Sequence, residues 1–185
     1  MKINSPFNEE VINNLKAGDS VLISGIIIGA RDAAHKKLSE IYNRNESMPL
    51  EFKNQTIYYL GPSPAKPGEI IGAAGPTTSG RMDKYTPMML ELGVKAMIGK
   101  GYRNKEVIES IIKHRAVYMV AIGGAGALIA KSIKKYEVIA YEELGAEAIS
   151  RLEVVDFPAI VAIDSKGNNF YEIGQEKYIH FDKCH

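Results

Sequence analysis

The stretch SVLISGIIIGARDAAHKKLSEIYN, residues 20–43, decides the fold class. Residues 20–30 are rich in β-branched side chains and predict a buried strand, and residues 31–43 predict a helix that begins where the strand ends. The same order recurs downstream. Further strand candidates are 56–62, 95–101 and 116–124, and further helix candidates are 84–93, 104–114 and 125–135. Alternation of strands and helices predicts an α/β layered fold.

Two segments argue against a purely parallel sheet. Residues 151–173 have the pattern of strands around a turn at 164–168, and residues 61–69, GPSPAKPGE, contain three prolines and two glycines and are predicted to be a loop. We therefore predict a mixed sheet flanked by helices. The length of 185 residues suits a single domain, 1–185, since domains typically have ~100–200 residues.

Composition narrows the class of protein. The net charge of +1 gives no general attraction to nucleic acid or membrane, so we expect neither partner. Apolar runs fall far short of the ~20 residues that a membrane helix needs, and the first 19 residues lack the features of a signal peptide. The single cysteine, Cys184, excludes a disulfide framework and a multi-cysteine metal site within this chain, and it favours the reducing cytoplasm.

Polar side chains follow three apolar segments, each interpreted as the end of a strand. The segments that follow are GARDAAH (29–35), GPTTSGRMD (75–83, after the apolar run 70–75) and GKG (99–101). Ligands in open α/β sheets bind beyond the carboxyl ends of strands, so Arg31, Arg81 and Lys100 are predicted to converge. Arginine binds carboxylates with two parallel hydrogen bonds and lysine adds a point charge. The predicted ligand is small and carries at least two negative groups.

The two arginines also have structural interpretations. Arg31 at the start of a helix opposes the helix dipole, which favours a functional role, although a pair with Asp32 is an alternative. Arg81 could simply pair with Asp83.

The hydroxyls, the histidine and the lysine have alternatives as well. Thr78 or Ser79 could cap the following helix, but capping explains one hydroxyl of three, which favours a functional Thr77. His35 could pack as a neutral, hydrogen-bonded side chain, and Lys100 could be a solvated turn residue. The residues alone favour neither interpretation for these two.

A glycine-rich segment, GGAGAL at 123–128, follows one strand candidate and begins a helix candidate. It departs from the dinucleotide pattern GxGxxG because its last position is Leu128, so close helix–strand packing explains it better. A nucleotide-dependent oxidoreductase built around this segment is one alternative function. A non-catalytic anion-binding module is another.

Six segments carry a resemblance to a known family. They are AAGPTTSGRMD, GPSPAKPGE, GARDAAHKKL, MIGKGYRNKEV, AIGGAGALIA and ELGAEAISRLEVVDFPAIVAIDSKGN. From about Leu15 to Gly167, and in colinear order along the chain, they closely resemble the β region of class I, iron–sulfur-dependent fumarate hydratases. This region is a separate subunit in many organisms and the C-terminal part of one chain in others. L-Tartrate dehydratase β subunits are similar too, and the Ser79–Asp83 form resembles the fumarase version.

This resemblance implies a swivelling β/β/α domain and a separate fumarate hydratase α subunit. That subunit would hold a 4Fe–4S cluster through three cysteines, with one iron open to substrate. A chain with one cysteine cannot ligate such a cluster alone, so the resemblance implies a hetero-oligomer, with a dimer of this chain alone as a further arrangement. The implied reaction is reversible hydration of fumarate to L-malate, and dehydration of L-tartrate or another 2-hydroxy-dicarboxylate is the alternative.

The resemblance also assigns roles. Thr77 resembles the residue proposed as catalytic base, and Arg31, Arg81 and Lys100 resemble the residues that hold the dicarboxylate. His35 is a second candidate for proton transfer. Threonine is a poor base at its ordinary pKa and would need cationic neighbours to favour the alkoxide. In the alternative, Thr77 hydrogen-bonds the substrate, and His35 or bound water moves the proton.

Overall fold

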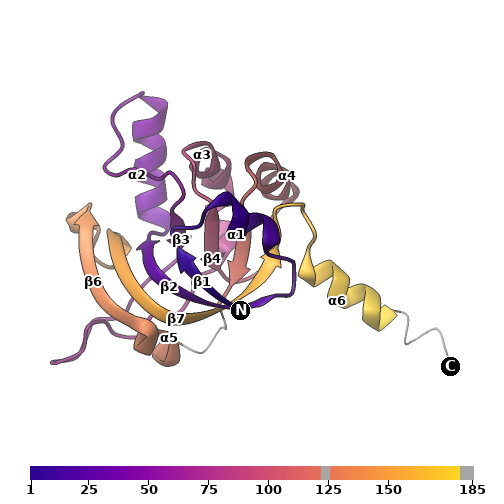
Figure 1. Ribbon diagram of the computed structural model, residues 1–185. Coiled ribbons are helices and arrows are strands. Elements are labelled where there is room, and N and C mark those ends of the chain that lie inside the picture. The colour runs from indigo at the N-terminus through magenta and orange to yellow at the C-terminus, as the bar shows by residue number, and fades with distance from the viewer. Residues whose placement is uncertain (122–125, 180–185) are drawn as a thin grey trace.

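The protein consists of a curved mixed sheet with helices on its faces (Figure 1). The structure is a computed structural model, and it describes residues 1–121 and 126–179. The strands are β1 (Lys2–Ser5), β2 (Ser20–Gly29), β3 (Thr56–Tyr58), β4 (Ala96–Gly99), β5 (Val117–Val120), β6 (Ile133–Ala140) and β7 (Ile149–Ile163). The helices are α1 (Glu9–Asn14), α2 (Asp32–Asn43), α3 (Thr86–Glu91), α4 (Lys105–His114), α5 (Gly126–Ser132) and α6 (Phe170–Ile179), with 3₁₀ helices η1 (Ser79–Tyr85) and η2 (Glu142–Glu147).

The strand order is β1-β2-β3-β4-β5-β7-β6, and β1 to β5 run parallel to their neighbours. β7 is antiparallel to β2, β5 and β6, which confirms the predicted mixed sheet. Because this 15-residue strand pairs with both β2 and β5, the pairings form a closed circuit through β2, β3, β4, β5 and β7. The curvature of β7 is visible in Figure 1.

The core divides into two clusters because successive side chains of a strand point to opposite faces. In β3, Ile57 belongs to the cluster under α2, α3 and α4, and Tyr58 belongs to the cluster that β7, α1 and α5 cover. Met97 and Ile98 of β4 divide in the same way. The helices α2, α3 and α4 lie together on one side of the sheet in Figure 1. Their packing against the second cluster supports the sheet edge from which α2 begins.

Several sequence predictions are confirmed. The strand at 20–30 and the helix at 31–43 are β2 and α2, and the helix at 104–114 is α4, which Asn104 caps through its side chain. Residues 61–69 form a loop, as predicted.

Three predictions of secondary structure are wrong in part. Residues 70–75 are irregular rather than strand, because the backbone next to β3 is paired by the following segment, where the Thr77 N–H donates to the Tyr59 carbonyl (2.9 Å). The helix at 125–135 ends at Ser132, and β6 begins directly after it.

The third prediction that is wrong in part is that residues 151–173 form strands around a turn. β7 is one long strand, and the chain after the turn becomes α6. The Asp164 carboxylate accepts hydrogen bonds from the Lys166 and Asn168 N–H groups and so forms the predicted turn. Asn169 then accepts from the Tyr171 N–H, as a residue before a helix does, and helix rather than strand follows.

Candidate functional site

The candidate site lies at the carboxyl ends of three neighbouring parallel strands. β2 ends just before Arg31. The loop that carries Thr77 is bonded to the Tyr59 carbonyl, just beyond β3. The Ser79 N–H donates to the carbonyl of Lys100, just beyond β4 (2.9 Å). The three polar segments found in the sequence are therefore side by side at one sheet edge, where ligands of α/β sheets bind.

Arg31 and Arg81 meet at one carboxylate, that of Asp32. The Arg31 Nε lies 3.1 Å from one Asp32 oxygen, and the Arg81 Nε lies 2.8 Å from the other. Burial alone would raise the pKa of Asp32, but the Arg31 hydrogen bond and the charges of both arginines outweigh it, so the pKa lies below its ordinary value. Two guanidinium groups from separate segments thus contact a single carboxylate at this edge of the sheet.

Arg31 is held from two further directions. Its Nη2 lies 3.6 Å from the Glu147 carboxylate, whose other oxygen accepts from the Ala33 N–H in the first turn of α2 (2.7 Å). This negative charge offsets the unfavourable position of an arginine at a helix start. Gly61 leaves the space for the guanidinium, since a Cβ there would collide with Arg31. The predicted alternative pair of Arg31 with Asp32 therefore exists, and it exists together with Arg81.

The alternative pair of Arg81 with Asp83 does not form. Asp83 instead accepts from the Arg103 Nε (2.6 Å), and Arg103 also donates to the Thr86 hydroxyl. The guanidinium lies over the rings of Tyr59 and Tyr118, 5.5 and 4.9 Å from their centroids. We call these five residues the Arg103 cluster. Burial would lower the pKa of Arg103, but Tyr59, Asp83 and Tyr118 outweigh it and the pKa is raised.

The Arg103 cluster joins two of the site's loops. The Asp83 carboxylate lies in η1 and also accepts from the Asn104 N–H (2.8 Å). The Tyr118 hydroxyl lies 2.8 Å from both the Ser79 hydroxyl and the Gly101 carbonyl. Ser79 is thus engaged in the core, and Thr78 makes no side-chain cap of η1, so helix capping does not account for these hydroxyls.

His35 lies buried in α2, with an exposed fraction of 1%. Its Nδ1 is 2.9 Å from the Arg31 carbonyl, which can only accept, so Nδ1 carries the proton. The Nε2 atom is buried, with no partner among the described residues. Burial lowers the pKa of His35 to about 4, so the ring is neutral at pH 7. The structural interpretation of His35 fits this geometry, and its part in proton transfer stays a prediction.

Thr77 and Lys100 are placed differently. Thr77 is half-buried in the loop between the Tyr59 carbonyl and η1. The side chain of Lys100 is exposed and has no ion pair within the described part of the chain, while its backbone forms a bridge with Thr78. This bridge joins Lys100 to the chain three residues before Arg81, so the two cationic residues lie on neighbouring loops.

Metal ligands do not gather in the described residues. In residues 1–121 and 126–179, no group of three or more His, Cys, Asp or Glu side chains could hold a metal ion, and Cys184 lies outside these ranges. The residues present therefore do not fit the ligation of an iron–sulfur cluster. None of the helices in the same ranges is long and apolar enough to cross a membrane.

Two features of the site escaped the sequence interpretation. Glu147 lies in a segment that carries the family resemblance but was given no role there, and only the fold brings it to α2. Arg103 lies inside the GKGYRN segment, where its distance of 20 residues from Asp83 gave no sign of a pair. Of the glycine-rich segment 123–128, residues 123–125 lie outside the described residues, and the remainder begins α5.

The sequence is similar to a known family over nearly its whole length. The model of the family described as fumarase C-terminus matches residues 1–174. The chain is 40% identical over 174 residues to the aerobic class I fumarate hydratase of Salmonella typhimurium, covering 92% of this chain and 30% of that protein. It is 40% identical over 162 residues to fumarate hydratase 2 of Leishmania major, covering 86% of this chain and 28% of that protein.

A third relative has a similar length. A protein from Methanocaldococcus jannaschii named as an L(+)-tartrate dehydratase subunit beta is 39% identical over 167 residues, covering 87% of this chain and 86% of the relative. The chain thus spans about a third of the fumarate hydratases it matches and most of this shorter protein.

Proposed function

This chain belongs to the fumarase C-terminus family, and we propose that it is the β subunit of a class I fumarate hydratase, which converts fumarate and L-malate into each other. Two groups of relatives support a hydro-lyase, since their names specify fumarate hydratases and a tartrate dehydratase subunit. We also assign the fold to the swivelling β/β/α domains, and the enzyme to the cytoplasm.

The meeting of Arg31 and Arg81 at the Asp32 carboxylate carries this proposal. Each arginine uses its Nε for Asp32, and Arg31 also pairs with Glu147 through Nη2. The terminal N–H groups of Arg81 have no ion pair within the described residues and can turn toward a ligand. A carboxylate bound beside Asp32 would receive hydrogen bonds from a planar, always charged donor. Lys100, in the adjacent loop, would then neutralise the second carboxylate of a short dicarboxylate.

Thr77 is the residue that we assign to the substrate carbon. Removing a proton next to a carboxylate builds negative charge on that carboxylate, and the nearby arginines would stabilise it in the transition state. The same cations would favour the threonine alkoxide that a base requires. His35 is the second candidate for proton transfer: it is neutral at pH 7, and its unprotonated Nε2 would have to gain access to substrate or water.

The rest of the active site would come from a partner. The fumarate hydratase relatives contain about two thirds of their length beyond the matched part, and in the proposal the corresponding region is an α subunit that ligates the 4Fe–4S cluster. When bound, such a cluster supplies a Lewis acid for the hydroxyl and carboxylate of the substrate. Dehydration of L-tartrate is the second candidate, because the tartrate dehydratase relative is the one whose length this chain matches.

An anaerobic turnover assay tests the proposal. This chain is mixed with the region that matches the remaining two thirds of the fumarate hydratases, expressed separately from the same organism, and offered fumarate, L-malate and L-tartrate. We expect fast fumarate–malate conversion that neither protein shows alone. Turnover of tartrate only would select the second candidate, and no turnover from a stable complex with an intact cluster would remove both.

Two variants locate the chemistry in this chain. Thr77→Val should abolish turnover without loss of the complex, while Thr78→Val, its exposed neighbour, should leave turnover nearly unchanged. A turnover of Thr77→Val close to that of the wild type would refute the role of Thr77. Addition of NAD should have no effect, which separates this function from a nucleotide-dependent oxidoreductase.

A further inference from the structure

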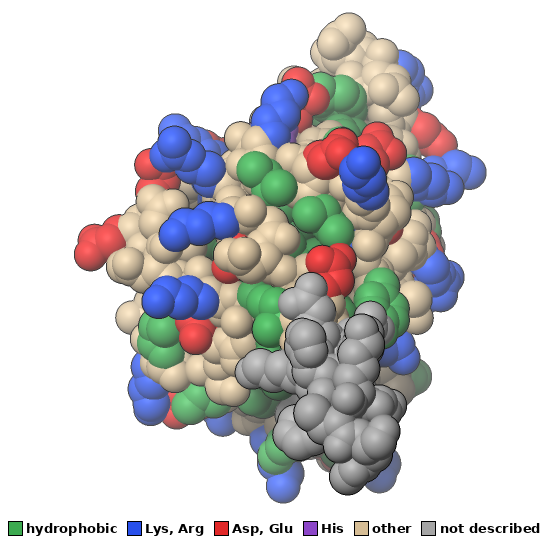
Figure 2. Space-filling view, turned by 90° about the vertical axis from the view of Figure 1, so that its right-hand side faces the viewer, with side chains coloured by type: hydrophobic (Ala, Val, Ile, Leu, Met, Phe, Trp, Pro, Cys, Tyr) green, Lys and Arg blue, Asp and Glu red, His purple; other side chains and the backbone are tan. Residues whose placement is uncertain are grey.

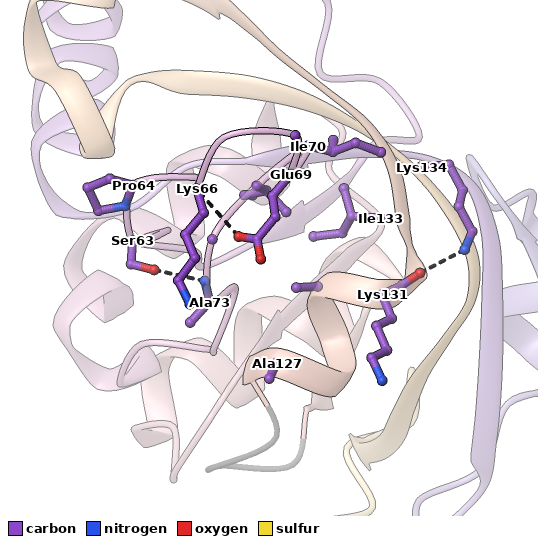
Figure 3. Close-up of a pocket in the computed structure, with 14 residues that line it drawn as sticks. Ser63, Pro64, Lys66, Glu69, Ile70, Ala73, Ala127, Lys131, Ile133 and Lys134 are labelled. Atoms are coloured by element: carbon purple, nitrogen blue, oxygen red, sulfur yellow. Dashed lines mark hydrogen bonds between the residues drawn. The ribbon is translucent and has the colours of Figure 1, made fainter.

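A groove separate from the arginine pair lies between the loop 63–73, α5 and the start of β6 (Figure 3). Its volume is about 640 Å³. Ile71 and Ile133 form a nearly buried floor, and small alanines of α5 complete the wall. None of the five proposed substrate and catalytic residues lines it, so the groove is not the substrate site itself.

The charges around the groove are mainly positive. Lys66 lies on the loop wall and Lys131 and Lys134 lie on the opposite wall, as Figure 3 shows. The Lys134 ammonium donates one hydrogen bond to the Lys131 carbonyl (2.7 Å) and keeps two further N–H groups for a partner. The acidic side chain in the lining, Glu69, is already engaged by the Lys66 N–H of its own turn (3.2 Å). On the face shown in Figure 2, by contrast, basic and acidic side chains are interspersed.

Ile70 of the loop lines the groove, and its apolar side chain is 52% exposed. All residues from 63 to 70 are exposed, and hydrogen bonds between Ser63 and Ala73 hold the base of this loop in place. A loop whose base is held in place, and which carries an exposed apolar side chain beside an apolar floor, is suited to burial by another polypeptide because its base needs no further ordering.

The groove also adjoins the candidate site. The Ala74 N–H donates to the Gly126 carbonyl (3.2 Å), and a Cβ on Gly126 would lie 3.1 Å from the Gly75 nitrogen. This close contact joins the first turn of α5 to the chain two residues before Thr77. A polypeptide seated in the groove would therefore lie next to the loop that carries Thr77 and Arg81.

We propose that this groove docks a segment of the α region, one with Asp or Glu side chains for the three lysines and an apolar side chain for the floor. This inference rests on the proposed function, since the α region is the two thirds of the fumarate hydratases that this chain does not match. Charge and shape favour such a segment over a four-carbon dicarboxylate, which would leave the apolar floor uncovered.

Association of the two purified proteins tests the docking site. Lys66→Glu/Lys131→Glu should raise the Kd for the separately expressed α region at least tenfold, because two attractions become repulsions. The control Lys105→Glu/Lys113→Glu makes the same charge change on the exposed side of α4 and should stay within twofold of the wild type. Added salt should weaken wild-type binding more than it weakens binding of the groove variant.

A photo-cross-linking amino acid at Ile70 identifies the occupant. Cross-links to an acidic segment of the α region would support the proposal. Cross-links only to a second copy of this chain, equal Kd values for both double variants, or no association of the wild type would overturn it. Turnover measured on the same samples separates the two proposals. If the complex depends on the groove lysines but has no turnover, only the proposed enzyme function is contradicted. If the complex is active and the groove variant binds as tightly as the wild type, only the docking site is contradicted.

Discussion

Two arginine–aspartate pairs include a residue of η1, Arg81 in one and Asp83 in the other, and their surroundings differ. Arg103 and Asp83 have side-chain exposures of 0% and 10%, whereas Arg81 and Asp32 have 53% and 27%. The N–O distances are nearly the same, 2.6 and 2.8 Å. The buried pair has no access to a ligand and joins two loops, whereas the exposed ion pair is open to solvent and, in the proposed function, would also contact a substrate carboxylate.

The largest expected effect is on the buried pair. Arg103→Met would leave the Asp83 carboxylate buried without its partner, which should lower the free energy of unfolding by about 3–5 kcal/mol. Urea denaturation of the purified chain measures this. Arg81→Met, the matched control on the exposed pair, should cost less than about 1 kcal/mol. Similar losses in the two variants would show that burial does not distinguish the pairs.

Arg81→Lys reverses the ranking when activity is measured. Lysine keeps the charge but loses the planar guanidinium that contacts Asp32 and that, in the proposed function, would also bind a substrate carboxylate. We expect kcat/KM of the assembled enzyme to fall by roughly 30-fold or more, which corresponds to about 2–5 kcal/mol for a charged hydrogen bond in a desolvated site. Stability should change little. A kcat/KM close to that of the wild type would show that Arg81 does not bind the substrate.

His35 extends the comparison to a buried group with an unused nitrogen. Its folded-state pKa of about 4 lies below the ordinary 6.5, so the unfolded chain binds the proton more tightly. The contribution of neutral, buried His35 to the free energy of unfolding is therefore fully present above about pH 6.5. It is lost as the pH falls toward 4, by on the order of 3 kcal/mol in total. Urea denaturation at several pH values between 7.5 and 4.5 follows this loss.

A variant isolates the histidine from the carboxylates that also titrate at low pH. Asn at this position can still donate to the Arg31 carbonyl, so His35→Asn should show a shallower loss of stability between pH 6.5 and 4.5. His114→Asn, at the end of α4, is the comparison: burial also lowers the pKa of this more exposed histidine, so its removal should reduce the slope by less. If His35→Asn changes the slope no more than His114→Asn does, His35 does not control acid stability.

The exposed site was more predictable from the sequence than the buried cluster. Arg31, Thr77 and Arg81 stood out because they follow apolar segments, and a position at the carboxyl end of a strand depends mainly on local pattern. The pairing of Asp83 with Arg103 depends on which loop packs next to the end of β4, and no local sequence pattern specifies that packing. In the same way, the run 70–75 has the composition of a strand, but Tyr59 already offers its carbonyl to Thr77, so tertiary pairing overrode the local preference.

Asp32→Asn should have the smallest effect and gives the sharpest test of the exposed pair. Asparagine can still accept hydrogen bonds but lacks the charge that attracts both guanidinium groups, so Arg81 should lose orientation rather than position. We expect KM to rise a few-fold with little change in kcat, equivalent to roughly 0.5–1 kcal/mol for a partly exposed ion pair. Initial rates of the assembled enzyme over a range of fumarate concentrations separate the two constants.

The direction of the KM change decides what Asp32 does. A rise means that the aspartate orients Arg31 and Arg81 for the substrate, as the use of both Nε atoms suggests. A fall in KM would mean that Asp32 competes with the substrate for the same guanidinium groups and that its removal frees them. In that case the exposed pair would resemble the buried one in being satisfied internally, and substrate would bind by displacing the aspartate rather than by joining it.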